Sequence, residues 1–162
     1  MKKKIAFIFA AMMLLCSLAS AHVANDEISV AGLVPYQAVN EKSLVEAYGE
    51  LKAQDEQNGH HFYAFEDVLV ITEGNGTVVE AYCKSNKYAP TKAGVNIGDD
   101  AAKLSSLYGA ADQTEEDKEH GVTIYVYYSE SAYMGFAVDN KTNVIVQTML
   151  GTPHKHDDGE HK

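Results

Sequence analysis

The sequence contains no arginine and no tryptophan, and it has only 2 cysteines and 3 prolines. Its 13 basic residues are therefore all lysine, against 23 acidic residues, and the formal net charge is −10. Arginine is the side chain best suited to phosphate groups, and a negative chain is repelled by nucleic acids and by anionic lipid surfaces. The composition argues against a nucleic-acid partner and favours cations or basic protein surfaces.

Long apolar runs are also scarce. The one clear run, residues 5–15, is roughly half the length of a membrane-spanning helix. Lysines precede it at residues 2–4, and the small residues Ala19, Ser20 and Ala21 follow it. This order is typical of a cleavable signal peptide over residues 1–21, so we expect an exported chain, periplasmic or extracellular, without a membrane span. Cleavage removes 3 of the 13 lysines and leaves 10 against 23 acidic residues, a net charge of −13.

The two cysteines lie in different contexts. Cys16 directly follows the apolar run, so its lipidation is an alternative to simple cleavage, although Leu14 and Leu15 stand where lipidation favours a small residue. After cleavage Cys83 has no cysteine in the chain to pair with. We expect it to be buried as a small apolar side chain.

The chain repeats a helical pattern. Residues 40–49 and 100–109 each begin with a residue suited to capping a helix and carry apolar residues at helical spacing. Each segment ends in Tyr-Gly, and glycine readily adopts the left-handed conformation that ends a helix. The two glycines, Gly49 and Gly109, are 109 − 49 = 60 residues apart.

A polar connection and three expected strands follow each helix. The strands are expected at 60–65, 68–72 and 77–83 in the first half, and at 122–128, 132–138 and 143–150 in the second. Extended segments at 28–34 and 93–97 precede the helices. We therefore predict an α+β domain over residues 22–152, made of two tandem αβββ halves at about 28–84 and 90–151. Together the halves form an antiparallel sheet with the short helices on one face.

Three features resemble a known architecture: the glycine-led helix start VNIGDD at residues 95–100, the Leu-x-x-Leu-Tyr-Gly helix end at 104–109, and the antiparallel meander. They resemble the BLIP-like fold, which includes the tandem-repeat β-lactamase inhibitor proteins and the SmpA/OmlA outer-membrane assembly lipoproteins. Secreted bacterial domains of the CAP-associated type carry a similar helix-to-glycine phrase. The resemblance implies a non-catalytic, protein-binding module of the bacterial cell envelope. The chain lacks the inhibitors' disulfide pair and a good lipidation context, so no functional residue is carried over.

Tyrosines gather on the expected sheet. Tyr63, Tyr125 and Tyr127 share one parity within their strands, and Tyr133 joins them on the next strand. If the alternate residues of the strand at 122–128 face the helices, these tyrosines face solvent and form a surface for a protein partner. The alternative is that tyrosine simply favours strands.

The C-terminal residues 153–162 are expected to be a disordered tail rich in metal-binding side chains. It carries His154, His156 and His161 together with Asp157 and Asp158. Imidazoles suit zinc, copper or nickel, and carboxylates can complete the shell. Metal binding or buffering by the tail is therefore the alternative function.

Other polar groups point less clearly to chemistry. Cleavage after Ala21 would leave His22 as an amino-terminal copper ligand, but no spacing selects a second ligand. His60 and His61 are adjacent on a strand and point to opposite faces, which disfavours a shared metal. The sequence contains no Ser-His-Asp signature, phosphate-cradling glycine loop or zinc-hydrolase motif, so we expect no enzymatic activity and no required cofactor.

Overall fold

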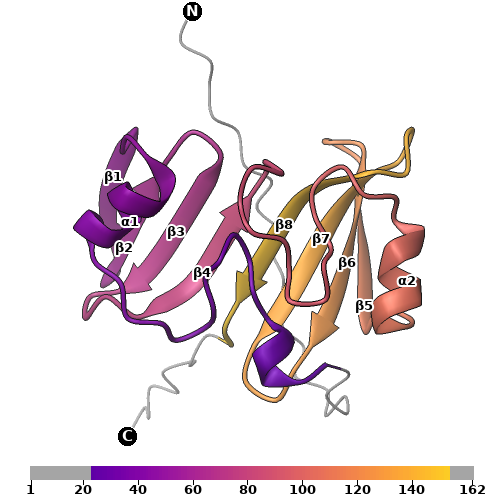
Figure 1. Ribbon diagram of the computed structural model, residues 1–162, viewed down its shortest axis with the longest axis horizontal. Coiled ribbons are helices and arrows are strands. Elements are labelled where there is room, and N and C mark those ends of the chain that lie inside the picture. Colours follow the sequence, from indigo (N-terminus) through magenta and orange to yellow (C-terminus); the bar gives the residue numbers. More distant parts are fainter. Residues whose placement is uncertain (1–22, 154–162) are drawn as a thin grey trace, which may run out of the picture.

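The computed structural model describes residues 23–153, which form two similar halves of a continuous sheet (Figure 1). A 3-10 turn, η1 (Asn25–Glu27), precedes them. The first half contains α1 (Glu41–Tyr48), β1 (Ala53–Gln57), β2 (His60–Ala64), β3 (Val68–Glu73) and β4 (Val78–Cys83). The second half contains α2 (Ala102–Tyr108), β5 (Gln113–Asp117), β6 (Val122–Tyr128), β7 (Tyr133–Asp139) and β8 (Ile145–Gly151).

The sheet has eight strands in the order β1-β2-β3-β4-β8-β7-β6-β5, and all neighbours pair antiparallel. Each half is a meander, and the last strands of the two halves, β4 and β8, pair at the centre. The first strands, β1 and β5, therefore lie at the two outer edges. Neither helix, nor any other helix within residues 23–153, has the length and apolarity needed to cross a membrane.

The predicted α+β class is wrong, because strands dominate the described residues. Helices α1 and α2 have only 8 and 7 residues, and they do not form a layer over the sheet. Loops instead cover the middle of the sheet on the side of the helices (Figure 1). The extended segments predicted at 28–34 and 93–97 belong to this loop cover and contain no strand of the sheet.

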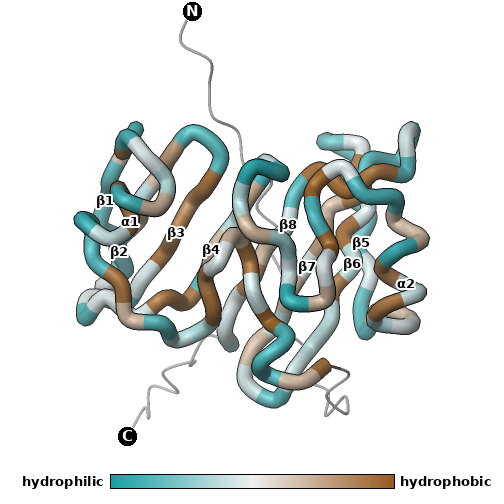
Figure 2. The backbone as a smooth tube through the Cα atoms, in the orientation of Figure 1, coloured by the Kyte–Doolittle hydropathy of each residue, from teal (hydrophilic) through white to brown (hydrophobic). Residues whose placement is uncertain are grey.

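Each half contains four strands where the sequence predicted three. The additional strands, β1 and β5, form in the connections that were interpreted as polar linkers. All five residues of β1 are exposed, and its sequence AQDEQ has no apolar alternation. Figure 2 shows β1 as hydrophilic and the inner strand β3 as hydrophobic. Polar, charged edge strands are typical of soluble sheets because they discourage pairing with other molecules.

Matching hydrogen bonds fix the entry to each helix. In the first half the Tyr36 N–H donates to the Val78 carbonyl at 2.9 Å, and in the second half the Gly98 N–H donates to the Ile145 carbonyl at 2.8 Å. Val78 and Ile145 begin the last strand of their halves. The segment that leads into each helix is thus held against the final hairpin of its own meander.

The tyrosine at the end of each helix forms a hydrogen bond with the loop that precedes the helix. The Tyr48 hydroxyl donates to the Ala31 carbonyl at 2.9 Å, and the Tyr108 hydroxyl lies 2.9 Å from the Thr91 Oγ1. Ala31 and Thr91 are again 60 residues apart, like the tyrosines themselves. The Tyr-Gly ending noted in the sequence therefore has a structural purpose in both halves.

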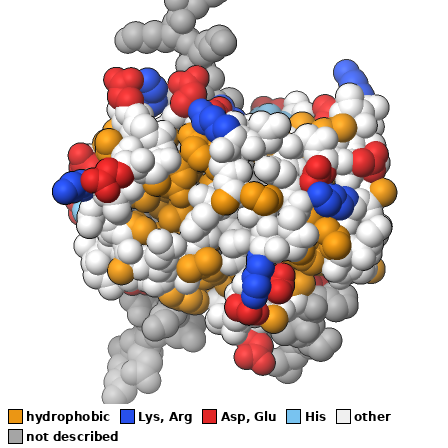
Figure 3. All heavy atoms as spheres, in the orientation of Figure 1, with side chains coloured by type: hydrophobic (Ala, Val, Ile, Leu, Met, Phe, Trp, Pro, Cys, Tyr) orange, Lys and Arg blue, Asp and Glu red, His pale blue; other side chains and the backbone are white. Residues whose placement is uncertain are grey.

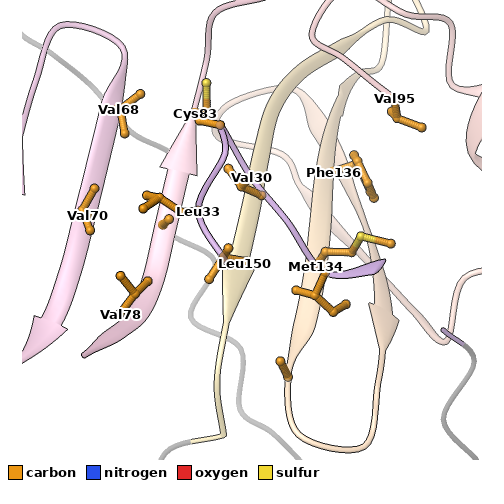
Figure 4. Packing of buried hydrophobic residues seen from close by; sticks show 14 of the residues in the cluster. Val30, Leu33, Val68, Val70, Val78, Cys83, Val95, Met134, Phe136 and Leu150 are labelled. Atoms are coloured by element: carbon orange, nitrogen blue, oxygen red, sulfur yellow. The ribbon is translucent and has the colours of Figure 1, made fainter. Parts of the chain in front are cut away.

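The main core lies between the sheet and its helices and loops. Figure 4 shows Val30 and Leu33 of the N-terminal loop over β4 and β8, next to Leu150. Val95 of the second loop lies toward Phe136 on β7. A second apolar cluster, contributed by the strands, lies on the opposite face of the sheet. Both faces of the inner strands are therefore apolar, so a tyrosine on either face of these strands can be buried.

Candidate binding pocket beside helix α2

The tyrosines predicted to form an open surface are mostly buried. Tyr127 is 1% exposed, and Tyr63 and Tyr133 are each 8% exposed. Tyr63, Tyr125 and Tyr127 point toward the helices and belong to or pack on the main core, whereas Tyr133 belongs to the cluster on the opposite face. The alternate residues Ile124 and Val126 face away from the helices, which reverses the assumption made from the sequence.

Two of these tyrosines meet in a pocket of about 290 Å³ between α2 and β6. The pocket is walled on one side by α2 and on the other by the segment that leads into β5, and small side chains predominate. Its lining residues are Ala101, Ala102, Leu104, Ser105, Gly109, Ala110, Ala111, Tyr125, Tyr127 and Asn143. Figure 3 shows several apolar patches on this side of the molecule, between charged side chains.

Tyr127 is the most deeply buried aromatic residue of the pocket. Its ring packs against Tyr108 and Phe136, with centroid distances of 5.1 and 6.1 Å. Its hydroxyl donates to the Gly109 carbonyl at 3.3 Å, at the end of α2. Burial raises the pKa of Tyr127 to about 12, so the side chain remains neutral and acts as a fixed wall.

Tyr125 is half-buried and provides a more accessible wall. Within residues 23–153 its hydroxyl has no hydrogen-bond partner, unlike those of Tyr108 and Tyr127. On the neighbouring strand β5, Thr114 lies opposite Tyr125 and Glu116 lies opposite Thr123. Because residues two apart on a strand share a face, exposed Glu116 is on the same side of the sheet as the pocket.

The rim beside the start of α2 is polar and hydrogen-bonded. Asn143, which adopts a left-handed φ of 58°, donates from its Nδ2 to the Asp100 Oδ1 at 3.3 Å. The same oxygen accepts the Ala102 N–H at 2.8 Å. Asp100 is exposed, so a carboxylate stands at the rim of a pocket that is lined mainly by small and aromatic side chains.

Nearby Lys103 is already paired. Its Nζ donates to the Asp99 Oδ2 at 2.8 Å and to the Gly94 carbonyl at 2.7 Å. The hydrogen bonds from Lys103 and from the Asn96 N–H lower the pKa of Asp99. The lysine thus helps to hold the loop before α2 and is not a free positive charge at the pocket.

The remaining predicted site residues are the metal-ligand candidates of the C-terminal tail. His154, His156, His161, Asp157 and Asp158 lie outside the described residues, as does His22. Within residues 23–153 no group of three His, Cys, Asp or Glu side chains is placed to hold a metal ion. Cys83 is 3% exposed, and burial raises the pKa of its thiol, in agreement with the apolar role expected for it.

Sequence reasoning missed the small residues that create the pocket. The segment Gly109-Ala110-Ala111 aligns with Gly49-Glu50-Leu51 of the first half. A residue-by-residue comparison of the two halves would have shown this loss of side-chain volume at the end of α2.

Comparison with known proteins supports the fold but assigns no family. No protein-family model matches the chain, and no curated protein matches its sequence. A cysteine-rich secretory protein from Staphylococcus aureus superposes with a TM-score of 0.59 at 12% identity, covering 82% of this chain and 49% of that one. An extracellular protein containing an SCP domain, from Bacillus anthracis, gives a TM-score of 0.50 at 11% identity, covering 71% and 43%.

A third solved structure matches over most of its own length. It is a DUF4309 family protein from Bacillus subtilis, with a TM-score of 0.53 at 14% identity, covering 79% of this chain and 88% of that one. This chain therefore spans about half of the first two proteins and most of the third. At these identities the likeness concerns the fold alone, and the resemblance to the BLIP-like group stays a prediction.

Proposed function

We propose that the chain is an exported, non-catalytic module that binds another protein through the side of the sheet that carries α2. The pocket beside α2 is the observation that carries this proposal. It is an opening with a half-buried tyrosine at its wall, whose hydroxyl has no hydrogen-bond partner within residues 23–153. Interfaces commonly place aromatic residues around such pockets, where one anchoring side chain contributes much of the binding energy.

Export to the periplasm or the extracellular space is the second part of the proposal. It is supported by the signal-peptide pattern at residues 1–21. Two solved structures with the same fold are described as a secretory and an extracellular protein, which agrees with it. The net charge of −13 expected after cleavage favours a partner with a basic surface.

The proposal is tested by isolating the partner from the native compartment. The mature chain, cross-linked in the source organism and recovered with its neighbours, supplies candidates that are then purified. A true partner binds the purified chain saturably, at a fixed stoichiometry in calorimetry, and more weakly in high salt. If no candidate binds saturably, or if the chain converts a candidate to product, the proposed function is wrong.

A further inference from the structure

We propose that the pocket beside α2 is the anchor site for a single apolar side chain of the partner, presented by a segment that also carries lysine or arginine. This inference rests on the function proposed above and names the chemistry of the partner. Three observations support it: the divergence of the two halves, the size and lining of the pocket, and the charge around it.

The two halves can be compared residue by residue because their backbones match. Lys52 donates its N–H to the Ala64 carbonyl just before β1, and Asp112 donates to the Val126 carbonyl just before β5, at 2.8 and 2.9 Å. Leu51 and Ala111 each stand one residue earlier. They therefore occupy the same place in their halves, and both pack against the main core.

The first half carries larger side chains at two of the places that line the pocket in the second half. Leu51 stands where the second half has Ala111, and Val45 of α1 stands where α2 has Ser105. The tyrosines at this place differ in exposure in the same sense: Tyr63 is buried, whereas its counterpart Tyr125 is only half-buried. An unfilled apolar space costs stability, so stability alone does not explain why the second half carries the smaller residues.

The pocket is suited to one side chain. Its volume of about 290 Å³ is just below the range of about 300–1,000 Å³ that is typical of small-molecule sites. The half-buried ring of Tyr125 offers a wall for stacking, and the alanines and Leu104 complete an apolar lining. An aromatic anchor in this place would stack on Tyr125 and contact the alanines.

The second half of the chain, which forms the pocket, is acidic. Residues 99–152 contain 9 acidic side chains and 3 lysines, a net charge of −6. Lys103 is paired with Asp99, and Lys118 lies 4.0 Å from Glu116 in an exposed contact that contributes little. Lys141 stands in the exposed turn near Asn143 and is the remaining cation. Asp100 at the rim and Glu116 along β5 therefore favour basic residues beside the anchor.

Three short peptides test the site directly: acetyl-Lys-Phe-Lys-amide, acetyl-Lys-Ala-Lys-amide and acetyl-Glu-Phe-Glu-amide. Each is titrated into the 15N-labelled mature chain while amide resonances are recorded by NMR. We expect the Lys-Phe-Lys peptide to shift the amides of Ser105, Gly109 and Ala111 and to bind at least about threefold more tightly than either control peptide. Raising the salt from about 0.02 to 0.2 M should weaken its binding by a further factor of about two to three.

The variant Ala111→Leu introduces the residue found at the same place in the first half. It should fill the pocket and abolish these shifts. Ala47→Leu adds the same volume at an exposed position of α1 and serves as the matched control, with binding unchanged. Equal binding of the Ala-centred or Glu-flanked peptide, shifts centred elsewhere, or full binding by Ala111→Leu would overturn the proposal. If Ala111→Leu binds the native partner as well as the wild type does, the anchor site is wrong while the binding function stands. Absence of any native partner rejects both.

Discussion

Gly76 lies in the turn between β3 and β4, and its replacement by alanine should be far more damaging than the same change at Gly32. Both glycines have a φ of 84°, so alanine at either position carries the left-handed cost of about 1–2 kcal/mol. At Gly32 an added Cβ meets nothing within 4 Å, whereas at Gly76 it would lie 2.5 Å from the Val39 carbonyl oxygen. A backbone atom cannot rotate away as a side chain can, so the turn and the segment entering α1 must separate.

That separation disturbs a specific hydrogen bond. The Val39 N–H donates to the Gly76 carbonyl at 2.9 Å, and this contact ties the entry of α1 to the hairpin. Forced overpacking typically costs about 1–3 kcal/mol, so the total for Gly76→Ala is about 2–5 kcal/mol. The difference between the two variants therefore isolates the steric clash from the backbone preference.

Urea unfolding of the mature chain, followed by circular dichroism, measures both losses. With a denaturant slope of about 2 kcal/mol per M, Gly32→Ala should lower the midpoint by about 0.5–1 M and Gly76→Ala by about 1–2.5 M. An unchanged slope is required for the two numbers to be compared. Equal midpoints for the two variants would contradict the close approach of Gly76 to Val39 and with it the described path into α1.

Four further perturbations test other parts of the molecule. Tyr108→Phe removes the hydroxyl beside Thr91 and should lower the free energy of unfolding by about 0.5–1.5 kcal/mol in the same urea assay; no loss would mean that the contact is not formed. Leu44→Ala, at a residue 1% exposed, should cost about 2–5 kcal/mol, against less than about 0.5 for exposed Val45→Ala, and similar losses would refute the packing of α1. Because the folded pKa of Asp99 is lowered, its ion pair stabilises the fold above the unfolded pKa of about 4 and is lost as pH falls through the folded value. Asp99→Asn should therefore be destabilising at pH 7, and this loss should shrink as the pH falls below about 4, as measured by thermal unfolding. For the tail, calorimetric titration with zinc, copper and nickel should show binding that deletion of residues 154–162 abolishes, and equal binding by a scrambled tail would reject a specific site.

Strong hydrophobic patterns made most elements predictable. The strand expected at 122–128 matches β6 residue for residue, and the expected helix at 40–49 contains α1 with its Asn40 cap. These segments bury apolar side chains, so the burial leaves a period in the sequence. The edge strands β1 and β5 bury little and leave no such period. The edge strands form because β2 and β6 present backbone groups for pairing. The sequences of β1 and β5 themselves do not show this.

The prediction of which way the tyrosines face was wrong for a related reason. Along β6 the residues facing the helices and those facing away are both largely apolar, since each face contributes to a core cluster. Alternation identifies two faces but does not say which of them the helices cover. The α2 pocket was hidden differently, because alanine and glycine at the end of a helix are common and carry no signal of their own. The small size of these residues becomes informative only when they are compared with the bulkier residues at the same places in the first half.

The central pairing of β4 with β8 also sets an order of events during folding. A chain emerging from its N-terminus completes the first meander from local contacts, yet the inner edge of β4 stays unpaired until β8 appears. Ala81 and Leu150, partners in that pairing, are 150 − 81 = 69 residues apart in the chain. Such distant contacts form late because closing a long loop costs entropy before any contact compensates for it. Until then the unpaired edge of β4 is open to pairing with a second unfinished copy of the chain.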